Sequence, residues 1–301
     1  MADVQTPAPR NISRMPLWIR SELGRAEHYG DTARAVSKNQ LNTVCVEARC
    51  PNRGECWSRG TATFMLLGDT CTRACGFCAV RTGRPTWFDS DEPRRVAEAA
   101  QALQLKYVVV TSVNRDDLSD GGAAIFAATL KALRARMPEC GVEFLTPDFR
   151  GCQGQAVERV AAALAELPID ARRDLVWGHN VETVPRLYRR ARKGSDFKRS
   201  LQLLGKAAQL ENVEAKSALM LGLGEQRDEV IDVLGALREA GVKRVSLGQY
   251  LRPSLAHLPV VEYITPAQFA EYENDARELG FRWVKAGPMV RSSYFAEQAH
   301  A

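Results

Sequence analysis

The chain has 301 residues, of which 45% are hydrophobic and 26% charged, and its formal net charge is +5. This composition is ordinary for a soluble globular protein with a full core, and no apolar run approaches the roughly 18 residues that a membrane span needs. The mild positive charge favours an acidic partner. No stripe of Lys and Arg is interleaved with aromatic residues, so the sequence does not predict a nucleic-acid surface.

The first 40 residues carry little periodicity. Residues 1–10 include an Asp and two prolines but no apolar segment, so they predict neither a secretory signal nor a transit peptide. We therefore expect a cytoplasmic protein. A short helix is predicted over 32–38, and we expect the whole stretch to lie as an arm on the main body.

Six of the eight cysteines fall between positions 45 and 78. In a cytosolic chain of this length, such clustering indicates metal ligation rather than a disulfide framework. Cys140 and Cys152 stand apart, and we expect them to be buried thiols, because free cysteine behaves as a small hydrophobic residue.

From residue 63 onward, short apolar runs alternate six times with amphipathic stretches. The predicted strands are 63–67, 107–111, 142–145, 175–177, 215–220 and 244–247, and the predicted helices are 92–103, 123–137, 156–166, 184–192, 228–240 and 266–279. This alternation predicts βαβ units around a parallel sheet, either a partial barrel or a doubly wound sheet. In both folds, functional residues gather at the C-terminal ends of the strands. A last apolar run, 281–284, leads into the tail.

The first cysteine set reads Cys71-Thr-Arg-Ala-Cys75-Gly-Phe-Cys78 and directly follows the first predicted strand. Full ligation of a four-iron cluster takes four cysteines, so three would leave one iron open to a chelating small molecule. A zinc knuckle is the alternative, but zinc cysteines come as pairs with a second pair or histidines at a distance, which this set lacks.

The second set, Cys45, Cys50 and Cys56, lies just before the first predicted strand. Taken alone, its spacing is also compatible with a structural role. Beside the first set, it suggests a second cluster.

Together with motifs spread over residues 16–296, the two sets resemble the lipoyl synthases, a family of the radical S-adenosylmethionine (SAM) superfamily. The matching motifs include Gly54-Glu-Cys56-Trp57, Val110-Thr-Ser-Val-Asn-Arg-Asp-Asp-Leu118, His179-Asn-Val-Glu-Thr-Val-Pro185, Leu219-Met-Leu-Gly-Leu-Gly-Glu225 and Gly287-Pro-Met-Val-Arg-Ser-Ser-Tyr294. The sequence departs from the family pattern at Ala218 and at Lys285, which leaves fine substrate positioning open but touches no cysteine.

The resemblance implies an α/β fold, a partial (βα)6 TIM-like barrel whose N- and C-terminal extensions complete a second cluster site. It divides the chain into an N-terminal extension (1–60), the barrel (61–285) and a C-terminal tail (286–301).

The resemblance also assigns two 4Fe-4S clusters. Cys71, Cys75 and Cys78 would hold the cluster that binds SAM. Cys45, Cys50 and Cys56, with Ser292 as fourth ligand, would hold the auxiliary cluster. For SAM itself it implies Phe77 near the adenine and Asn114, Arg115, Asp116 and Asp117 after the second strand; no catalytic residue is expected beyond the cluster ligands.

The implied reaction is radical insertion of two sulfur atoms at carbons 6 and 8 of an octanoyl-lysine, with sulfur donated by the auxiliary cluster. The implied partners are octanoylated lipoyl carrier domains (2-oxoacid dehydrogenase acyltransferase subunits and the glycine cleavage H protein), a flavodoxin or ferredoxin as electron donor, and an iron–sulfur cluster carrier; neither nucleic acid nor a membrane is expected.

Three further features have open interpretations. His179, Asn180 and Glu182 follow the fourth predicted strand and either face the site or, for His179, serve a structural role. Gly222 and Gly224 either admit the cofactor or form a tight turn. The third feature is a run of basic residues, called the basic run below: Arg186, Arg189, Arg190, Arg192, Lys193, Lys198 and Arg199. It is most simply a solvated helix face, but it is also a candidate docking surface for an acidic carrier.

Two other functions remain compatible with the cysteines. One is another sulfur-inserting radical enzyme, resembling biotin synthase or a methylthiotransferase, although such enzymes place their auxiliary ligands elsewhere. The other is a non-catalytic cluster or zinc protein.

Overall fold

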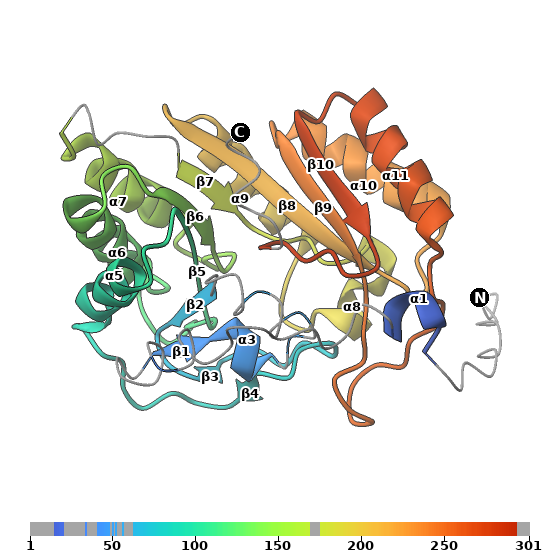
Figure 1. Ribbon diagram of the computed structural model, residues 1–301, viewed down its shortest axis with the longest axis horizontal. Helices are drawn as coiled ribbons and strands as arrows, with labels where there is room; N and C mark the ends of the chain where they lie inside the picture. Colours follow the sequence, from blue (N-terminus) through green and yellow to red (C-terminus); the bar gives the residue numbers. More distant parts are fainter. Residues whose placement is uncertain are drawn as a thin grey trace.

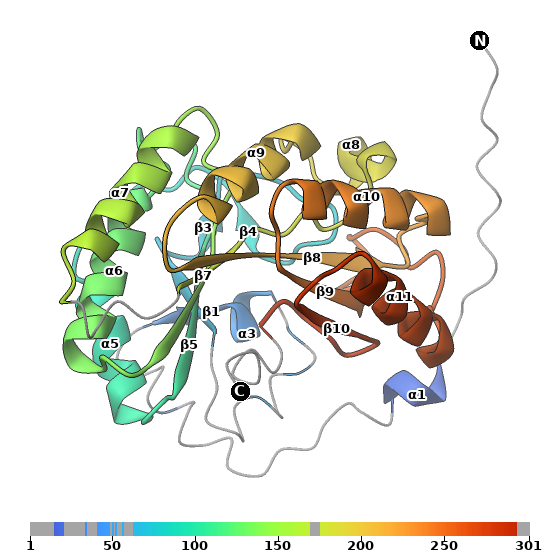
Figure 2. The ribbon, with the colours of Figure 1, turned by 90° about the horizontal axis from the view of Figure 1, so that it is seen from above.

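The structure is a computed structural model. It describes residues 15–20, 34, 41–48, 50, 52, 56, 63–168 and 175–293. These residues form an open, strongly curved eight-stranded sheet whose convex side is covered by helices (Figures 1 and 2). In order, its strands are β1 (Asn42–Thr43), β2 (Thr63–Leu66), β5 (Tyr107–Ser112), β6 (Gly141–Leu145), β7 (Leu175–Gly178), β8 (Val213–Leu221), β9 (Arg244–Gln249) and β10 (Trp283–Gly287). All pairings from β2 to β10 are parallel, and β1 alone runs antiparallel, against β2. The expected partial barrel is confirmed.

The connections between parallel strands pass through helices on the outside of the sheet. These are α5 (Glu92–Ala102), α6 (Ala123–Arg136), α7 (Gln153–Ala165), α9 (Phe197–Ala208), α10 (Arg227–Glu239) and α11 (Pro266–Glu278). The short helices α1 (Leu17–Arg20) and α3 (Val44–Glu47) precede β2, and the short helices η2 (Pro185–Leu187) and α8 (Tyr188–Ala191) precede α9. A small two-stranded sheet, β3 (Thr70–Cys71) and β4 (Arg81–Thr82), follows β2. None of the described helices is both long enough and apolar enough to span a bilayer.

All six predicted strands are present, but the barrel has a seventh parallel strand. Residues 281–284, expected only to lead into the tail, run into β10, which pairs with β9 from Trp283 to Gly287. The helix predicted over 32–38 lies, except for Arg34, outside the described residues.

The predicted helix over 184–192 is wrong as a single element. Pro185 begins one 3-10 turn, a four-residue helix follows, and Gly194 with φ +83° ends that segment. The helix that covers β8 is α9, which begins after Asp196, whose side chain accepts a hydrogen bond from the backbone N–H of Arg199. Its buried positions include Leu203 and Leu204, and this apolar side is what fixes α9 on the sheet.

The core divides into two clusters of buried side chains along the sheet. One lies under α5, α6 and α7, where the Phe126 ring makes edge contacts with Phe144 and Phe149 at centroid distances of 5.1 and 6.1 Å. The other lies under α10 and α11 and includes Val233 and Phe269. Both clusters leave the C-terminal ends of the strands free for polar residues.

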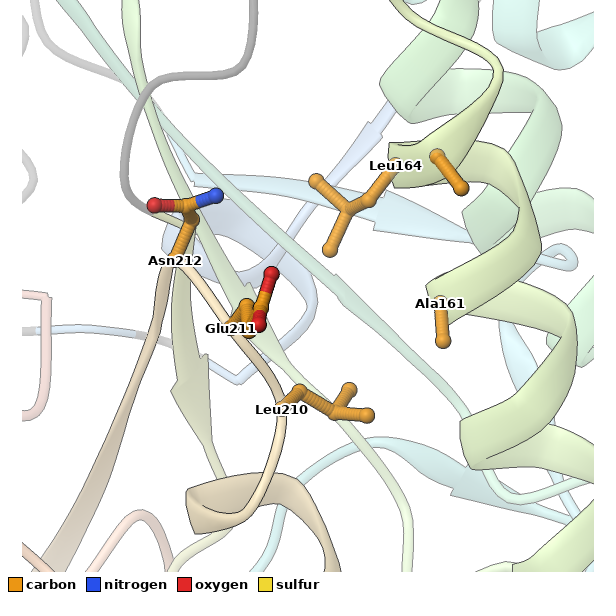
Figure 3. Close-up of a pocket in the computed structure, with 6 residues that line it drawn as sticks. Ala161, Leu164, Leu210, Glu211 and Asn212 are labelled. Carbon is orange, nitrogen blue, oxygen red and sulfur yellow. The ribbon is translucent and has the colours of Figure 1, made fainter.

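A surface pocket of about 180 Å³ lies between α7 and the turn before β8 (Figure 3). Ala161, Leu164, Leu210 and Glu211 line it. It opens at the N-terminal end of β8, which is the edge of the sheet opposite to the cysteines that follow β2.

After β10 the chain turns back over the sheet and passes close to β9. A Cβ atom on Gly248 would stand 2.0 Å from the carbonyl oxygen of Val290, so only glycine admits the tail at this point.

We therefore predict that Gly248→Ala displaces the segment from 288 onward. The expected result is a loss of about 1–3 kcal/mol in the free energy of unfolding, typical of overpacking, and faster proteolysis of the tail. Gly235→Ala in α10 is the matched control, because nothing lies within 4 Å of its added methyl group. That control should raise stability by roughly 0.5–1 kcal/mol. Equal tail proteolysis in both variants would contradict the close approach.

Candidate functional site

The loop with Cys71, Cys75 and Cys78 lies at the C-terminal end of β2, where a barrel places its functional groups. Two contacts of Gly76 fix the loop: its N–H donates to the carbonyl of Ala191 (2.9 Å), and its own carbonyl accepts from Leu258 (2.9 Å). A Cβ atom on Gly76 would lie 3.0 Å from the Leu258 side chain. The cysteine loop is therefore packed between the end of α8 and the segment after β9.

His257 adds a third contact to the loop. Its Nε2 donates to the carbonyl of Cys78 (3.1 Å), while Nδ1 lies 2.8 Å from the hydroxyl of Ser254. Since a carbonyl can only accept, the neutral ring must carry its proton on Nε2 and accept from Ser254 at Nδ1.

The thiols of this loop lie in an environment that disfavours free thiolates. Burial raises the pKa of Cys75 to about 12 and that of Cys78 to about 11, and the nearby Glu182 and Cys71 add to both shifts. At Cys71, the backbone N–H groups of Asn114 and Arg73 point to Sγ at 3.3 and 3.4 Å. Bound iron would supply the positive charge that deprotonates such thiols, and N–H donors to sulfur are a known means of tuning a cluster. The residues present fit an iron–sulfur cluster.

The described part of the chain places no three Cys, His, Asp or Glu side chains around one point where a single metal ion would bind. A four-iron cluster makes no such demand, because each of its cysteines binds a different iron.

The second cysteine set lies on a short folded segment beside β2. Thr43 pairs with Phe64 across β1 and β2, and its hydroxyl accepts from the N–H of Val46 at the start of α3, which carries the buried Cys45. The N–H of Cys50 then bonds the carbonyl of Cys45 (3.3 Å). This pairing places the start of the second set at the edge of the barrel, beside β2.

The C-terminal tail contacts this second set. The Nδ2 of Asn52, a buried residue between Cys50 and Cys56, donates to the carbonyl of Met289 (2.7 Å) across 237 positions of sequence. Its Oδ1 is buried without a hydrogen-bond partner in the described chain. The guanidinium of Arg291 lies close enough to Cys50 and Glu182 for their charges to affect its pKa. The tail therefore reaches the segment that carries Cys50, and the residue types present, three cysteines and a serine, fit a second cluster.

Glu182 is a charged residue close to the first cysteine set and to the tail residue Arg291. Its carboxylate influences Cys75 and Cys78 on one side and Arg291 on the other. Burial raises the pKa of this carboxyl, although Arg192, Asn180 and Arg291 oppose the shift. The sequence placed Glu182 at the strand ends, and the structure adds that its charge acts on both the first cysteine set and Arg291 of the tail.

Four of the predicted SAM contacts lie on the loop after β5, next to the cysteine loop. The carbonyl of Asn114 accepts from the backbone N–H of Thr72 (3.0 Å), and the carboxylate of Asp116 accepts from the hydroxyl of Thr72 (3.1 Å). Arg115 instead is buried and pairs with Asp117, with a further contact to the carbonyl of Leu67. Phe77 is half-buried against the second core cluster.

Arg73, inside the first cysteine set, is a residue that the sequence analysis missed. Its guanidinium makes bidentate contacts to both Asp116 and Asp148 at 2.7–2.8 Å, and a fifth contact to Ser195 (3.1 Å). Burial alone would raise the pKa of Asp148, but the bonds from Arg73 and Arg199 hold it at about 2. The usable signal was an arginine between two of the predicted ligand cysteines and an aspartate just after a strand.

His179 has a structural role. It is buried, its Nδ1 lies 2.8 Å from the carbonyl of Thr146, and its Nε2 lies 3.0 Å from the hydroxyl of Ser200. Burial lowers its pKa to about 3, with Arg192 adding to the effect, so the ring is neutral at ordinary pH. Gly222 has a φ of +104°, and a Cβ atom there would lie 2.4 Å from the carbonyl of Glu262, so the position requires glycine.

The basic run is not one solvated face. Arg192 is buried, Arg199 pairs with Asp148, and Arg186 pairs with Glu229. Besides Arg186, the exposed members are Arg189, Arg190, Lys193 and Lys198. They lie on α8, in the loop that follows it and at the start of α9, close to the Ala191–Gly76 contact that fixes the cysteine loop.

Comparison with known proteins gives a consistent family. Residues 65–247 match the Radical SAM superfamily model. The lipoyl synthase of Methylococcus capsulatus is 52% identical over 289 residues, covering 96% of this chain and 87% of that protein. The lipoyl synthase of Nitrosospira multiformis is 48% identical, covering 95% and 88%.

Solved structures of low identity support the fold. Methylornithine synthase aligns with a TM-score of 0.52 at 11% identity, over 89% of this chain and 80% of that one. Streptococcus suis SuiB bound to S-adenosylmethionine aligns with a TM-score of 0.53 at 12% identity, over 78% and 54%.

We predict that Arg73→Gln disrupts the cysteine loop, because it leaves the carboxylate of Asp148 buried with Arg199 as its main counter-charge. The free energy of unfolding should fall by roughly 3–5 kcal/mol, as when one partner of a buried pair is removed. Iron bound per chain after anaerobic reconstitution should also fall. Urea denaturation and iron analysis measure these effects.

Arg81→Gln is the control for this prediction. Arg81 also adjoins the loop, but its pair with Asp69 is exposed, with 68% and 46% of the side chains accessible. Removing this pair should lower the free energy of unfolding by less than about 1 kcal/mol. Equal losses in the two variants would show that Arg73 has no special role in holding the loop.

Proposed function

The chain belongs to the lipoyl synthase family of the radical SAM superfamily, and we propose that Cys71, Cys75 and Cys78 hold the cluster that binds SAM, while Cys45, Cys50, Cys56 and Ser292 hold the auxiliary cluster. The enzyme inserts two sulfur atoms at carbons 6 and 8 of an octanoyl-lysine on a lipoyl carrier domain. Its cofactors are 4Fe-4S clusters and SAM.

This assignment contains no side-chain acid or base, because the cofactors carry the chemistry. Carbons 6 and 8 carry unactivated C–H bonds that no side chain can deprotonate, so general base catalysis has nothing to offer. When bound, SAM and the two clusters supply the carbon radical that abstracts hydrogen and the sulfur that replaces it. The protein must position these groups and exclude water.

The observation that carries the ligand assignment is the position of Glu182. Its charge reaches Cys75 and Cys78 and also Arg291, which in turn lies near Cys50. An octanoyl chain must meet both clusters in one reaction, so the two ligand sets have to face each other. Asn52 and Met289 support the inclusion of Ser292, because their hydrogen bond brings the tail to the auxiliary cysteines.

We also propose the finer SAM contacts and the chain division that the family resemblance implies. Phe77 would pack beside the adenine, and Asn114, Arg115, Asp116 and Asp117 would lie at the methionine end of SAM. Residues 1–60 and 286–301 would act as extensions of the barrel at 61–285. The pairing of β1 with β2 and the passage of the tail over β9 support this division.

The partners we propose are acidic octanoylated carrier domains. The exposed cations Arg189, Arg190, Lys193 and Lys198 would dock them next to the cysteine loop. The resemblance further implies a flavodoxin- or ferredoxin-type donor, an iron–sulfur carrier and a cytoplasmic location.

The assignment predicts that a substitution in each cysteine set removes a different activity. The reconstituted protein should bind about eight irons and add two sulfurs to an octanoyl-lysine peptide in the presence of SAM and dithionite. Cys75→Ala should abolish SAM cleavage, whereas Cys50→Ala should still cleave SAM but add no sulfur. Mass spectrometry of the peptide and chromatography of 5′-deoxyadenosine measure both.

Cys140→Ala is the control, since Cys140 is buried beside the carbonyl of Leu105 in the core. It should retain both activities. SAM cleavage by the unmodified protein without sulfur addition would favour a different sulfur-inserting enzyme, and zinc without cleavage would favour a non-catalytic module.

The docking surface predicts an effect that depends on substrate size. Replacing Arg189, Arg190 and Lys193 with Gln should raise KM for a whole carrier domain roughly tenfold at low salt, because exposed ion pairs contribute about 0.2–1 kcal/mol each. Turnover of a short octanoyl peptide should not change. Gln at Lys206 and Lys243, which are exposed near the opposite edge of the sheet, is the control. An unchanged KM at low salt would exclude this surface.

A further inference from the structure

A buried lysine inside the barrel contacts the C-terminal tail. Lys216 lies in β8 with 1% of its surface exposed. Its Nζ donates to both carboxylate oxygens of Glu143 in β6, at 2.9 and 2.8 Å, and to the backbone carbonyl of Ser292 at 2.6 Å. An ammonium group has three N–H donors, so these three contacts satisfy it completely.

The contacts around this lysine belong to the barrel wall. Glu143 is itself 1% exposed and accepts a further hydrogen bond from the hydroxyl of Tyr107 in β5 (3.0 Å). The Nζ of Lys216 also lies 5.0 Å from the ring centre of Trp283 in β10. Side chains of β6 and β10 therefore hold the ammonium group in place before the tail contributes anything.

The tail has few other contacts to the body of the protein. In the described chain, Met289 is held by Asn52, and Val290 packs over Gly248. The side chain of Arg291 bonds carbonyls of the tail itself, at Val290 and Pro288. Among the described residues, the barrel holds the backbone of Ser292 through Lys216, and a charged donor makes this hydrogen bond stronger than an ordinary one.

We propose that Lys216 is the positioning residue for Ser292: by fixing its carbonyl to the barrel wall, Lys216 sets where the hydroxyl that completes the auxiliary cluster lies. This inference rests on the proposed assignment of Ser292 as a ligand. With Met289 and Ser292 both held, the residues between them have little freedom, and the serine oxygen is presented to iron without a further ordering cost. Loss of the Lys216 contact leaves the ligand on a segment fixed at one end only.

Such an arrangement matters because serine is a less usual iron ligand than cysteine. An alkoxide oxygen is harder than thiolate, so retention of the fourth iron depends more on how well the oxygen is placed. The same contact makes the ligand releasable, since breaking one hydrogen bond frees the end of the tail while the three cysteines stay in place.

The test uses the full chain with Cys71, Cys75 and Cys78 replaced by Ala, so that only the auxiliary cluster is reconstituted. Lys216→Met alone would leave Glu143 as a buried unpaired charge, so the test variant is Lys216→Met with Glu143→Gln. The readouts are iron and sulfide per chain, the rate of iron loss to a chelator, the electron paramagnetic resonance spectrum after reduction, and hydrogen exchange of residues 286–293.

We expect the double variant to lose iron to the chelator about tenfold faster, because it lacks the charged donor that holds the carbonyl of Ser292. Exchange of the tail amides should rise as well. Tyr107→Phe is the matched control, because it removes a hydrogen bond from the same network but leaves the Lys216–Ser292 contact. It should retain iron like the parent chain.

Two outcomes separate the inference from the assignment on which it rests. If Ser292→Ala leaves the spectrum and the rate of iron loss unchanged, Ser292 is not the ligand and the proposed assignment fails. If Ser292→Ala changes both but the double variant does not, the role of Lys216 is refuted alone.

Should the Met and Gln pair fail to fold by circular dichroism, Lys216→Gln with Glu143→Gln replaces it. This neutral pair keeps an amide donor, and we expect a rate of iron loss between those of the parent and of Ser292→Ala. A rate equal to that of the parent would refute the proposal.

Discussion

The guanidinium of Arg73 is the contact on which the geometry of the site depends. It lies between two of the proposed ligand cysteines and bonds Asp116 after β5 and Asp148 after β6, so one side chain ties the cysteine loop to two neighbouring strand ends. Buried charges of this kind are costly unless every donor is paired, and here five contacts satisfy the group. A loop that must hold three thiols around an inorganic cluster is thereby given the rigidity of the barrel.

The second cysteine set depends on the meeting of segments from both ends of the sequence. The barrel is open: β1 forms its edge beside β2, and α3 lies on the concave side of the sheet (Figure 2). Asn52 then bonds Met289, and Lys216 reaches the carbonyl of Ser292 from the barrel wall. A cluster that is to be consumed and rebuilt is reasonably placed between segments that are held by a few hydrogen bonds rather than by a continuous core.

Much of the fold was predictable because its physical cause is local. Branched apolar runs and amphipathic stretches recur at a regular interval, and all six predicted strands are present. The errors lie where local pattern is weak. The strand β10 looked like a tail because only its pairing with β9 makes it a strand, and α9 was overlooked because basic residues such as Lys198 and Arg199 obscured the apolar positions Leu203 and Leu204.

The sequence by itself determined the chemistry of the site. The spacing of Cys71, Cys75 and Cys78 and the second set near the barrel entrance indicated two clusters, since ligand type and order are properties of the chain. Only the tertiary structure decided which polar residues support them. Partners such as Arg73 with Asp148, or Lys216 with the carbonyl of Ser292, are separated by about 75 positions, and no periodicity links residues that meet only after the sheet has curved and its strand ends have converged.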